Sequence, residues 1–419
     1  MRGEFDKSRV EVMVQRRGRI IQLDVLRAVA VLWVIVFHAG DPPPNVHGSV
    51  VGSVMCRLMS CGWIGVDLFF VLSGFLVSGL LFQEYKTHGQ VRLGRFLLRR
   101  GLKIYPGFYV LILGTVLGIW LFGASALQER KLSLARVLTE CFFVQNYLPG
   151  LWIHTWSLAI EEHFYLLLGL GTLALIRLRP ARPFDSIFKY FLVIAVLELT
   201  LRVLTSVFLT PFGFYTHCSP THLRIDALLF GVVISYYSHF RPAALEFVRR
   251  FRLRILALSA TLLSPSLFLR QDDFWMHTGG ITLLYIGFGG VLLVAISLPF
   301  NANLSLLAAA PAYVGLHSYS IYLWHLPVQV FGLPLMSRLM GVQFGYFEYL
   351  LLFIIMSVAT GIVMSRAVEF PILKVRDKLF PSSAPLPTAA PKSLVQDEER
   401  GSARGRMPLF LGKEDRCKV

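Results

Sequence analysis

Apolar runs close to 20 residues long recur along the chain and restrict its fold more than any other feature. A helix of this length crosses the hydrocarbon core of a bilayer while satisfying its own backbone polar groups. Ten such runs occur, at residues 20–39, 62–82, 104–123, 156–176, 188–209, 223–238, 254–269, 278–298, 308–331 and 347–369. The composition agrees, with 55% hydrophobic residues and a mean hydropathy of +0.61. The sequence therefore predicts an all-α integral membrane protein with about ten transmembrane helices.

The positions of the basic residues predict how these helices are oriented. The formal net charge is +16, and the Lys and Arg residues are concentrated in every second loop, at 83–103, 177–190 and 239–254. Cytoplasmic loops are enriched in Lys and Arg, so topology explains this charge better than nucleic-acid binding does. Loop 124–155, with three basic residues, fits the alternation least well. We expect both termini in the cytoplasm and the protein in the inner membrane of a bacterium.

The two ends of the chain differ from the apolar part. Residues 1–19 form a basic segment, and no small-residue cleavage site follows the first apolar run, so we expect that run to be retained as a span. Residues 381–419 are rich in Pro, Ser and charged residues without periodicity, which is typical of a disordered tail. Residues 20–372 then form one membrane domain, with no further soluble domain expected.

The five cysteines show no spacing typical of metal ligands, and we expect no metal site. Cys56, Cys61, Cys141 and Cys218 fall in or beside loops that the topology places outside. Disulfides between them are an alternative to the buried free thiols that we expect.

Arg27 and His38 interrupt the first apolar run. They are eleven residues apart, which places both on one face of a helix and about 16 Å apart along its axis. A cation inside a span costs at least ~2.5 kcal/mol, so it requires a partner or a ligand. Asp24 is one possible partner; a functional site is the alternative that we favour. His38 lies close to the outer membrane surface in the predicted topology.

Further ionisable residues fall in the outer halves of four other predicted spans. They are Asp67 in the second span, Glu161, Glu162 and His163 in the fourth, Arg224 and Asp226 in the sixth, and His325 in the ninth. Ionisable groups at such depth normally face a bundle interior or a wet cavity. Arg224 and Asp226 could simply pair with each other, and His325 could cap a helix bend. A shared polar chamber explains all of them together.

A second group of charges precedes the third span on the cytoplasmic side. Arg95, Arg99, Arg100 and Lys103 follow one another at helical spacing. Such a run is what cytoplasmic orientation requires. It would also suit a clamp for an anionic group such as a nucleotide phosphate.

Acyl transfer fits this combination of a basic cytoplasmic entrance and an outer His/carboxylate chamber. A hydroxyl becomes a good nucleophile when a base removes its proton, and histidine suits that task. A neighbouring carboxylate would orient the ring. A proton-coupled transporter or exporter is the alternative, with the same residues as a proton relay. It leaves the Arg27 and His38 pair without a specific task.

The chain resembles the membrane-bound acyltransferase-3 family, whose members O-acylate sugars and polysaccharides. The resemblance covers about residues 20–372 and follows six motifs in order. They are the Arg27 and His38 pair, GVDLFFVLSGFL (65–76), TWSLAIEEHFY (155–165), RIDALLFG (224–231), YSIYLWHLP (319–327) and VEFP (368–371).

The resemblance implies an acyl-CoA donor, most often acetyl-CoA, with His38 as an essential residue and Arg27 binding or positioning the donor. The basic pair of the family falls on Arg100 and Lys103, where Lys103 replaces an arginine and loses its bidentate fork. Glu161 aligns with the recurrent acid. The candidate catalytic residues are therefore His38, Asp67, Glu161 and His325, and the acceptor is a hydroxyl of an exported polysaccharide, a lipid-linked sugar or a glycoside.

Overall fold

The computed structural model describes residues 20–43, 49–122, 133–298 and 302–381, and its described residues form helices without strands. The long helices are α2 (Ile21–His38), α4 (Gly65–His88), α5 (Leu93–Phe122), α7 (Trp156–Leu178), α8 (Ile187–Phe208), α12 (Ile281–Ser297) and α16 (Tyr346–Met364). Within these described residues, seven helical segments are long and apolar enough to cross a membrane, which confirms a multi-span helical membrane protein. The predicted segment 1–19 and the tail from residue 382 lie outside the described residues.

Shorter helices cover the remaining predicted spans. They are α9 (Ile225–Phe240), α11 (Arg252–Leu263), α13 (Ala302–Leu316) and α14 (Ser318–Pro327). The predicted span 308–331 is interrupted at His317, where α13 ends and α14 begins. A π-helical turn at Val328–Gly332 then joins α14 to α15 (Leu333–Met340). Every predicted run thus coincides with helix, while the number of ten crossings stays a prediction.

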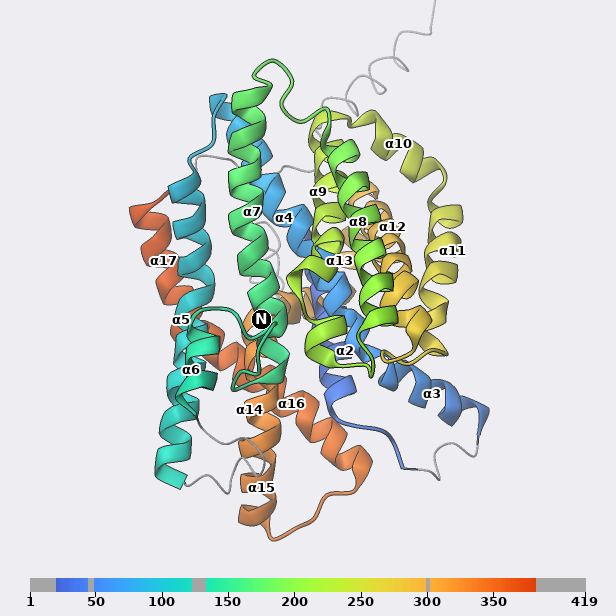
Figure 1. The fold of residues 1–419 in the computed structure, drawn as a ribbon. Helices are drawn as coiled ribbons and strands as arrows, with labels where there is room; N and C mark the ends of the chain where they lie inside the picture. The colour runs from blue at the N-terminus through green and yellow to red at the C-terminus, as the bar shows by residue number, and fades with distance from the viewer. Residues whose placement is uncertain (1–19, 44–48, 123–132, 299–301, 382–419) are drawn as a thin grey trace, which may run out of the picture.

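The two ends of the bundle carry different connections. The α4–α5 and α7–α8 connections and α10 (Ala243–Arg250) lie at one end, at the top of Figure 1. The short helices α3 (Val50–Ser60), α6 (Leu134–Cys141) and α15 lie at the other end. The basic loops identified in the sequence therefore share one end of the bundle, as positive-inside orientation requires.

Glycines allow the central helices to approach closely. The α carbon of Gly74 on α4 faces the backbone of α9, and an added Cβ would lie 1.9 Å from the Leu228 carbonyl oxygen. At Gly315 on α13 an added Cβ would lie 1.7 Å from the Asp24 carbonyl oxygen on α2. Helices in lipid associate through such small residues because packing, rather than water exclusion, drives their contact. Two glycine contacts thus fix α9 on α4 and α13 on α2.

Candidate active site

His38 is the last residue of α2, and its ring is held by two partners. Nδ1 lies 2.8 Å from the Val34 carbonyl oxygen and 3.3 Å from Nε2 of His325 on α14. The ring centroids of the two histidines are 4.9 Å apart. The structure therefore brings together two residues, His38 and His325, that are 287 positions apart in the sequence.

The carbonyl partners determine which ring nitrogens carry protons. A carbonyl oxygen only accepts, so Nδ1 of His325, 2.5 Å from the Tyr322 carbonyl oxygen, carries its proton and Nε2 accepts. Nδ1 of His38 in turn donates to the Val34 oxygen and to Nε2 of His325. The lone pair of His38 then lies on Nε2. A half-buried imidazole with its free lone pair on Nε2 is arranged to take a proton from a hydroxyl.

Further side chains surround the buried His325 ring. The ring of His154, in the turn before α7, lies 4.9 Å from it, and His154 Nε2 lies 3.1 Å from the Leu323 carbonyl oxygen. The Tyr322 hydroxyl donates to the His154 carbonyl oxygen at 2.6 Å and lies 2.8 Å from Ser157 Oγ. These bonds join α14 to the start of α7. The orientation of His325, and through it that of His38, thus depends on both helices.

A charged cluster lies around Arg27, further along α2 from His38. Arg27 of α2 interacts electrostatically with Glu161 of α7 and with Arg100 and Lys103 of α5. All four side chains are half-buried. The Arg100 guanidinium lies over the Tyr165 ring, 5.7 Å from its centroid. Four of the residues predicted from the sequence therefore lie close enough to interact electrostatically, although they come from three helices.

Hydrogen bonds and one ion pair hold this cluster in place. The Tyr165 hydroxyl donates to Glu161 Oε2 at 2.5 Å and lies 2.9 Å from Ser73 Oγ on α4. Lys103 Nζ lies 3.2 Å from Glu369 Oε1, in the π-helical turn Ser365–Glu369 that follows α16. Glu369 also accepts from the Ser320 hydroxyl at 2.8 Å. Lys103 is thus paired, while Arg27 and Arg100 supply the remaining positive charge of the cluster.

Tyr322 connects the charged cluster to the histidines. Its ring lies 5.6 Å from that of His325, and it interacts electrostatically with Glu161. Arg27 and His38 lie on one face of α2, about 16 Å apart along the axis. Polar side chains therefore occur both in the charged cluster and at the end of α2, with Tyr322 beside His325.

Asp67 has a different environment from the other candidate catalytic residues. Its Oδ1 lies 2.7 Å from Nη2 of Arg224, and both side chains are almost fully buried. Asp226 pairs with Arg202 of α8 at 2.8 Å, so the alternative in which Arg224 and Asp226 pair with each other is wrong. The two ion pairs join α4, α8 and α9 inside the bundle.

Glu162 and His163, the neighbours of Glu161, face other elements. The Tyr105 hydroxyl donates to Glu162 Oε2 at 2.9 Å, and His163 Nδ1 lies 2.7 Å from Thr221 Oγ1.

The basic residues at the start of α5 also have different partners from one another. Arg99 pairs with Asp377 at 3.1 Å and donates to the Phe380 carbonyl oxygen, which ties α5 to α17 (Phe370–Leu379).

Sequence reasoning missed Tyr322, His154 and Glu369. Each lies within, or directly beside, a motif that was singled out: Tyr322 in YSIYLWHLP, His154 before TWSLAIEEHFY, and Glu369 in VEFP. The sequence also predicted a carboxylate to orient His38, whereas the ring is held by Val34 and His325. The motifs contained the signal, but only the fold shows which of their members touch.

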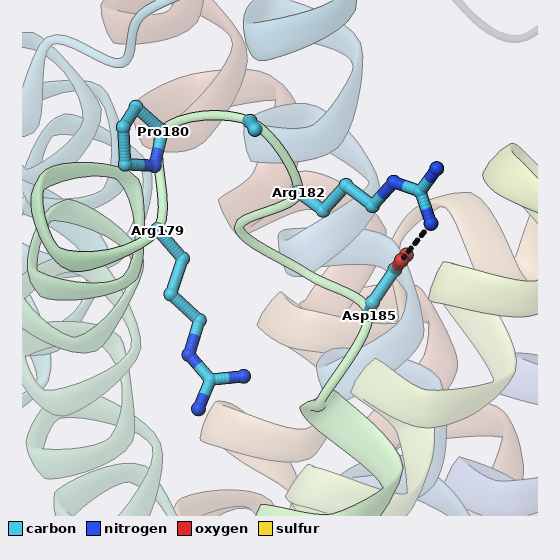
Figure 2. Close-up of a pocket in the computed structure, with 5 residues that line it drawn as sticks. Arg179, Pro180, Arg182 and Asp185 are labelled. Carbon is cyan, nitrogen blue, oxygen red and sulfur yellow. Dashed lines mark ion pairs between the residues drawn. The ribbon is translucent and has the colours of Figure 1, made fainter.

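The described surface includes two cavities at opposite ends of the bundle. One, of about 400 Å³, is lined by the α7–α8 connection, where Arg182 lies 3.9 Å from Asp185 (Figure 2). It lies at the basic end of the bundle (Figure 1). The other, of about 710 Å³, is lined by Phe37 and Asp41 at the end of α2 and by α3.

Cys56, Cys61, Cys141 and Cys218 are free thiols. Within the described ranges no group of three His, Cys, Asp or Glu residues could hold a metal ion.

A family model described as an acyltransferase domain, that of the acyltransferase-3 family, matches residues 20–366. The chain belongs to this family. The match includes both residues of the α2 pair and nearly the whole described bundle, so the resemblance drawn from the six motifs is confirmed.

Two relatives are similar to this chain over most of its length. The chain is 28% identical over 397 residues to the O-acetyltransferase OatA of Staphylococcus aureus (strain NCTC 8325 / PS 47), covering 90% of this chain and 60% of that protein. It is 26% identical over 343 residues to the peptidoglycan O-acetyltransferase OatA of Listeria monocytogenes, covering 77% of this chain and 51% of that protein. The chain thus spans only part of the length of these relatives. No solved structure matches it.

Proposed function

We propose that this protein is a membrane O-acetyltransferase that moves an acetyl group from acyl-CoA to a carbohydrate hydroxyl. The observation that carries the proposal is the His38 ring. Its Nδ1 is committed to Val34 and His325, and its Nε2 is left as a base at the end of a membrane-embedded helix. The membership of the acyltransferase-3 family and the names of the two relatives support the same reaction class.

The base acts on the acceptor. Nε2 of His38 takes the hydroxyl proton while the oxygen attacks the thioester carbonyl. The C–S bond then breaks, and the proton passes to the departing thiolate, so the products are an acetyl ester and free CoA. The thioester is already activated, so the protein contributes mainly positioning and proton transfer. His325 keeps the His38 ring in the tautomer that this step needs.

The charged cluster is the proposed site of the donor. An acyl-CoA carries several negative phosphate charges, and guanidinium groups bind phosphate oxygens in bidentate geometry. Arg27 and Arg100 are the cations left after Lys103 pairs with Glu369. Glu161, bonded to Tyr165, fixes the geometry of this cluster. A donor that enters from the basic end would extend its acyl end along α2 towards His38.

The acceptor is proposed to approach from the opposite end of the bundle, outside the cytoplasmic membrane of a bacterium. The Listeria relative is named for peptidoglycan, so a peptidoglycan fragment is the first acceptor to test. Exported polysaccharides and lipid-linked sugars complete the panel.

The test is label transfer by the purified protein in nanodiscs. Radiolabelled acetyl-CoA is supplied with each acceptor to the wild type, His38→Ala and a matched control, His88→Ala, in which an exposed histidine at the end of α4 is removed. We expect labelled acceptor with the wild type and the control only. Wild-type rates from a folded His38→Ala protein, or no transfer by the wild type to any acceptor, would overturn the proposal.

A second variant tests the donor site. Arg27→Ala should raise the KM for acetyl-CoA, whereas Arg27→Lys, which keeps the charge, should raise it less. An unchanged KM and kcat in Arg27→Ala would remove Arg27 from the donor site.

A further inference from the structure

The larger cavity lies between the end of α2, α3 and the segment 266–272 that follows α11. Its volume of about 710 Å³ is within the range typical of small-molecule sites. Along the chain, the lining residues Phe37 and Asp41 flank His38 on either side, and the ring centroids of Phe37 and His38 are 5.3 Å apart. The cavity wall at Phe37 is therefore next to the proposed base, although His38 itself does not line the cavity. We call it the outer cleft.

Aromatic faces and hydrogen-bonding groups alternate on its walls. Phe268 is 68% exposed, and the Arg57 guanidinium lies over its ring, 5.2 Å from the centroid. Phe212 and the buried Trp63 supply further aromatic surface. Aromatic rings of this kind pack against the apolar face of a ligand and leave the polar groups at the edge of that ligand free to hydrogen-bond.

The charged groups of the outer cleft balance one another. Two cations, Arg57 and Arg270, stand beside two acids, Asp41 and Asp272. A hydrogen bond from Arg270, 3.1 Å away, lowers the pKa of Asp272, so this carboxylate stays ionised at neutral pH. Ser60 Oγ donates to Asp41 Oδ1 at 3.0 Å and fixes that carboxylate. A balanced set of donors and acceptors suits an uncharged polyhydroxyl ligand better than an anionic nucleotide.

We propose that the outer cleft binds the saccharide acceptor, with aromatic rings against the C–H faces of the sugars and the Asp and Arg groups on their hydroxyls. This assignment rests on the proposed acetyl transfer. A saccharide chain bound along Phe268 and Phe212 runs past the end of α2, where Phe37 and Asp41 place one hydroxyl at His38. Exposed polar groups on the walls disfavour a lipid acyl chain as the occupant, because such a chain leaves them without partners.

Direct binding tests the assignment independently of turnover. Saturation-transfer NMR on the protein in nanodiscs would use three uncharged tetrasaccharides, among them the β-1,4-linked N-acetylglucosamine tetramer. We expect wild type and His38→Ala to bind at least one of them equally. We expect Phe268→Ala to bind it about 10-fold more weakly and Asp272→Asn to bind it several-fold more weakly. The same variants should raise the acceptor KM in proportion.

Two controls match these variants at the other end of the bundle. Phe247→Ala removes an exposed aromatic ring of α10, and Glu246→Gln removes an exposed acid that pairs with Arg249 at 2.7 Å. Both should bind saccharide like the wild type. No binding of any tetrasaccharide, or equal binding by Phe268→Ala and wild type, would overturn the assignment. Saccharide binding without acetyl transfer would instead contradict the proposed function and leave the cleft assignment standing.

Discussion

At the scale of single residues, a histidine base depends on the group that receives its other N–H. In this protein the Nδ1–H of His38 faces two acceptors, the Val34 carbonyl oxygen at 2.8 Å and Nε2 of His325 at 3.3 Å, and His325 accepts because its own Nδ1–H is bound to the Tyr322 carbonyl oxygen. A neutral acceptor positions the ring without adding a negative charge beside it. We therefore propose that His325 is a positioning residue that acts through His38.

Replacing His325 should affect turnover more than binding. We expect His325→Phe, which keeps the ring volume but loses one of the two acceptors of the His38 Nδ1–H, to lower kcat by roughly 10²-fold with little change in either KM. His325→Gln, which can place an amide oxygen near the position of Nε2, should recover part of the loss. Steady-state kinetics in nanodiscs and a thermal melt of each variant provide the measurement. Equal losses in Phe and Gln variants that melt like the wild type would contradict the positioning role.

Asp67 is expected to influence stability strongly. Removing one partner of a buried ion pair leaves an uncompensated charge, so Asp67→Leu should cost about 3–5 kcal/mol of unfolding free energy. The double variant Asp67→Leu/Arg224→Met removes both charges and should recover most of the lost unfolding free energy. Unfolding in detergent measures both effects. A single variant as stable as the wild type would show that the Asp67–Arg224 bond contributes little.

Acetyl transfer by the stable double variant also tests the proposed catalytic role of Asp67. Loss of transfer at normal stability would support that role. Retained transfer would show that Asp67 has a structural role only, in which it holds α4 against α9.

At the scale of helices, the α4–α9 contact depends on the absence of a side chain at position 74. We expect Gly74→Ala to lower the melting temperature and the yield of folded protein, because its methyl group would meet the Leu228 carbonyl, which belongs to rigid helix backbone. Gly171→Ala on α7 is the matched control, since an added Cβ there meets nothing within 4 Å. Indistinguishable melting curves for the two variants would contradict this packing.

The helices could be predicted from the sequence to a large extent, because apolar length alone identifies a span. The interruption at His317 was not predicted, although the polar residues His317, Ser318 and Ser320 stand there in the sequence. The candidate site shows the same division. Residue type and depth identified Arg27, His38 and His325, but the pairing of His38 with His325 depends on how α2 and α14 pack. The ion pair between Lys103 and Glu369 likewise could not be predicted without the fold.

At the scale of the whole molecule, the basic connections and the proposed donor entrance share one end of the bundle, and the outer cleft lies at the other. The predicted topology makes a direct test possible. A membrane-impermeant maleimide should label Arg338→Cys on α15 in intact cells, and Arg182→Cys in the α7–α8 connection only after permeabilisation. Both positions are exposed, whereas the four described native cysteines are buried or half-buried. Labelling of Arg182→Cys in intact cells would show that the protein has the opposite orientation to the predicted one.

The Asp67–Arg224 bond also has a consequence for biosynthesis. Its partners are 157 residues apart, so at typical rates of chain elongation Asp67 is made roughly 8–30 s before Arg224. An ionised Asp alone in a helix costs about 2.5–3.5 kcal/mol at the bilayer centre. During this interval the unpaired carboxylate lowers the free energy that α4 gains on release into lipid. The helices from α4 to α9 are therefore best delivered to the bilayer as one group, held at the insertion machinery until the counter-charge has been translated.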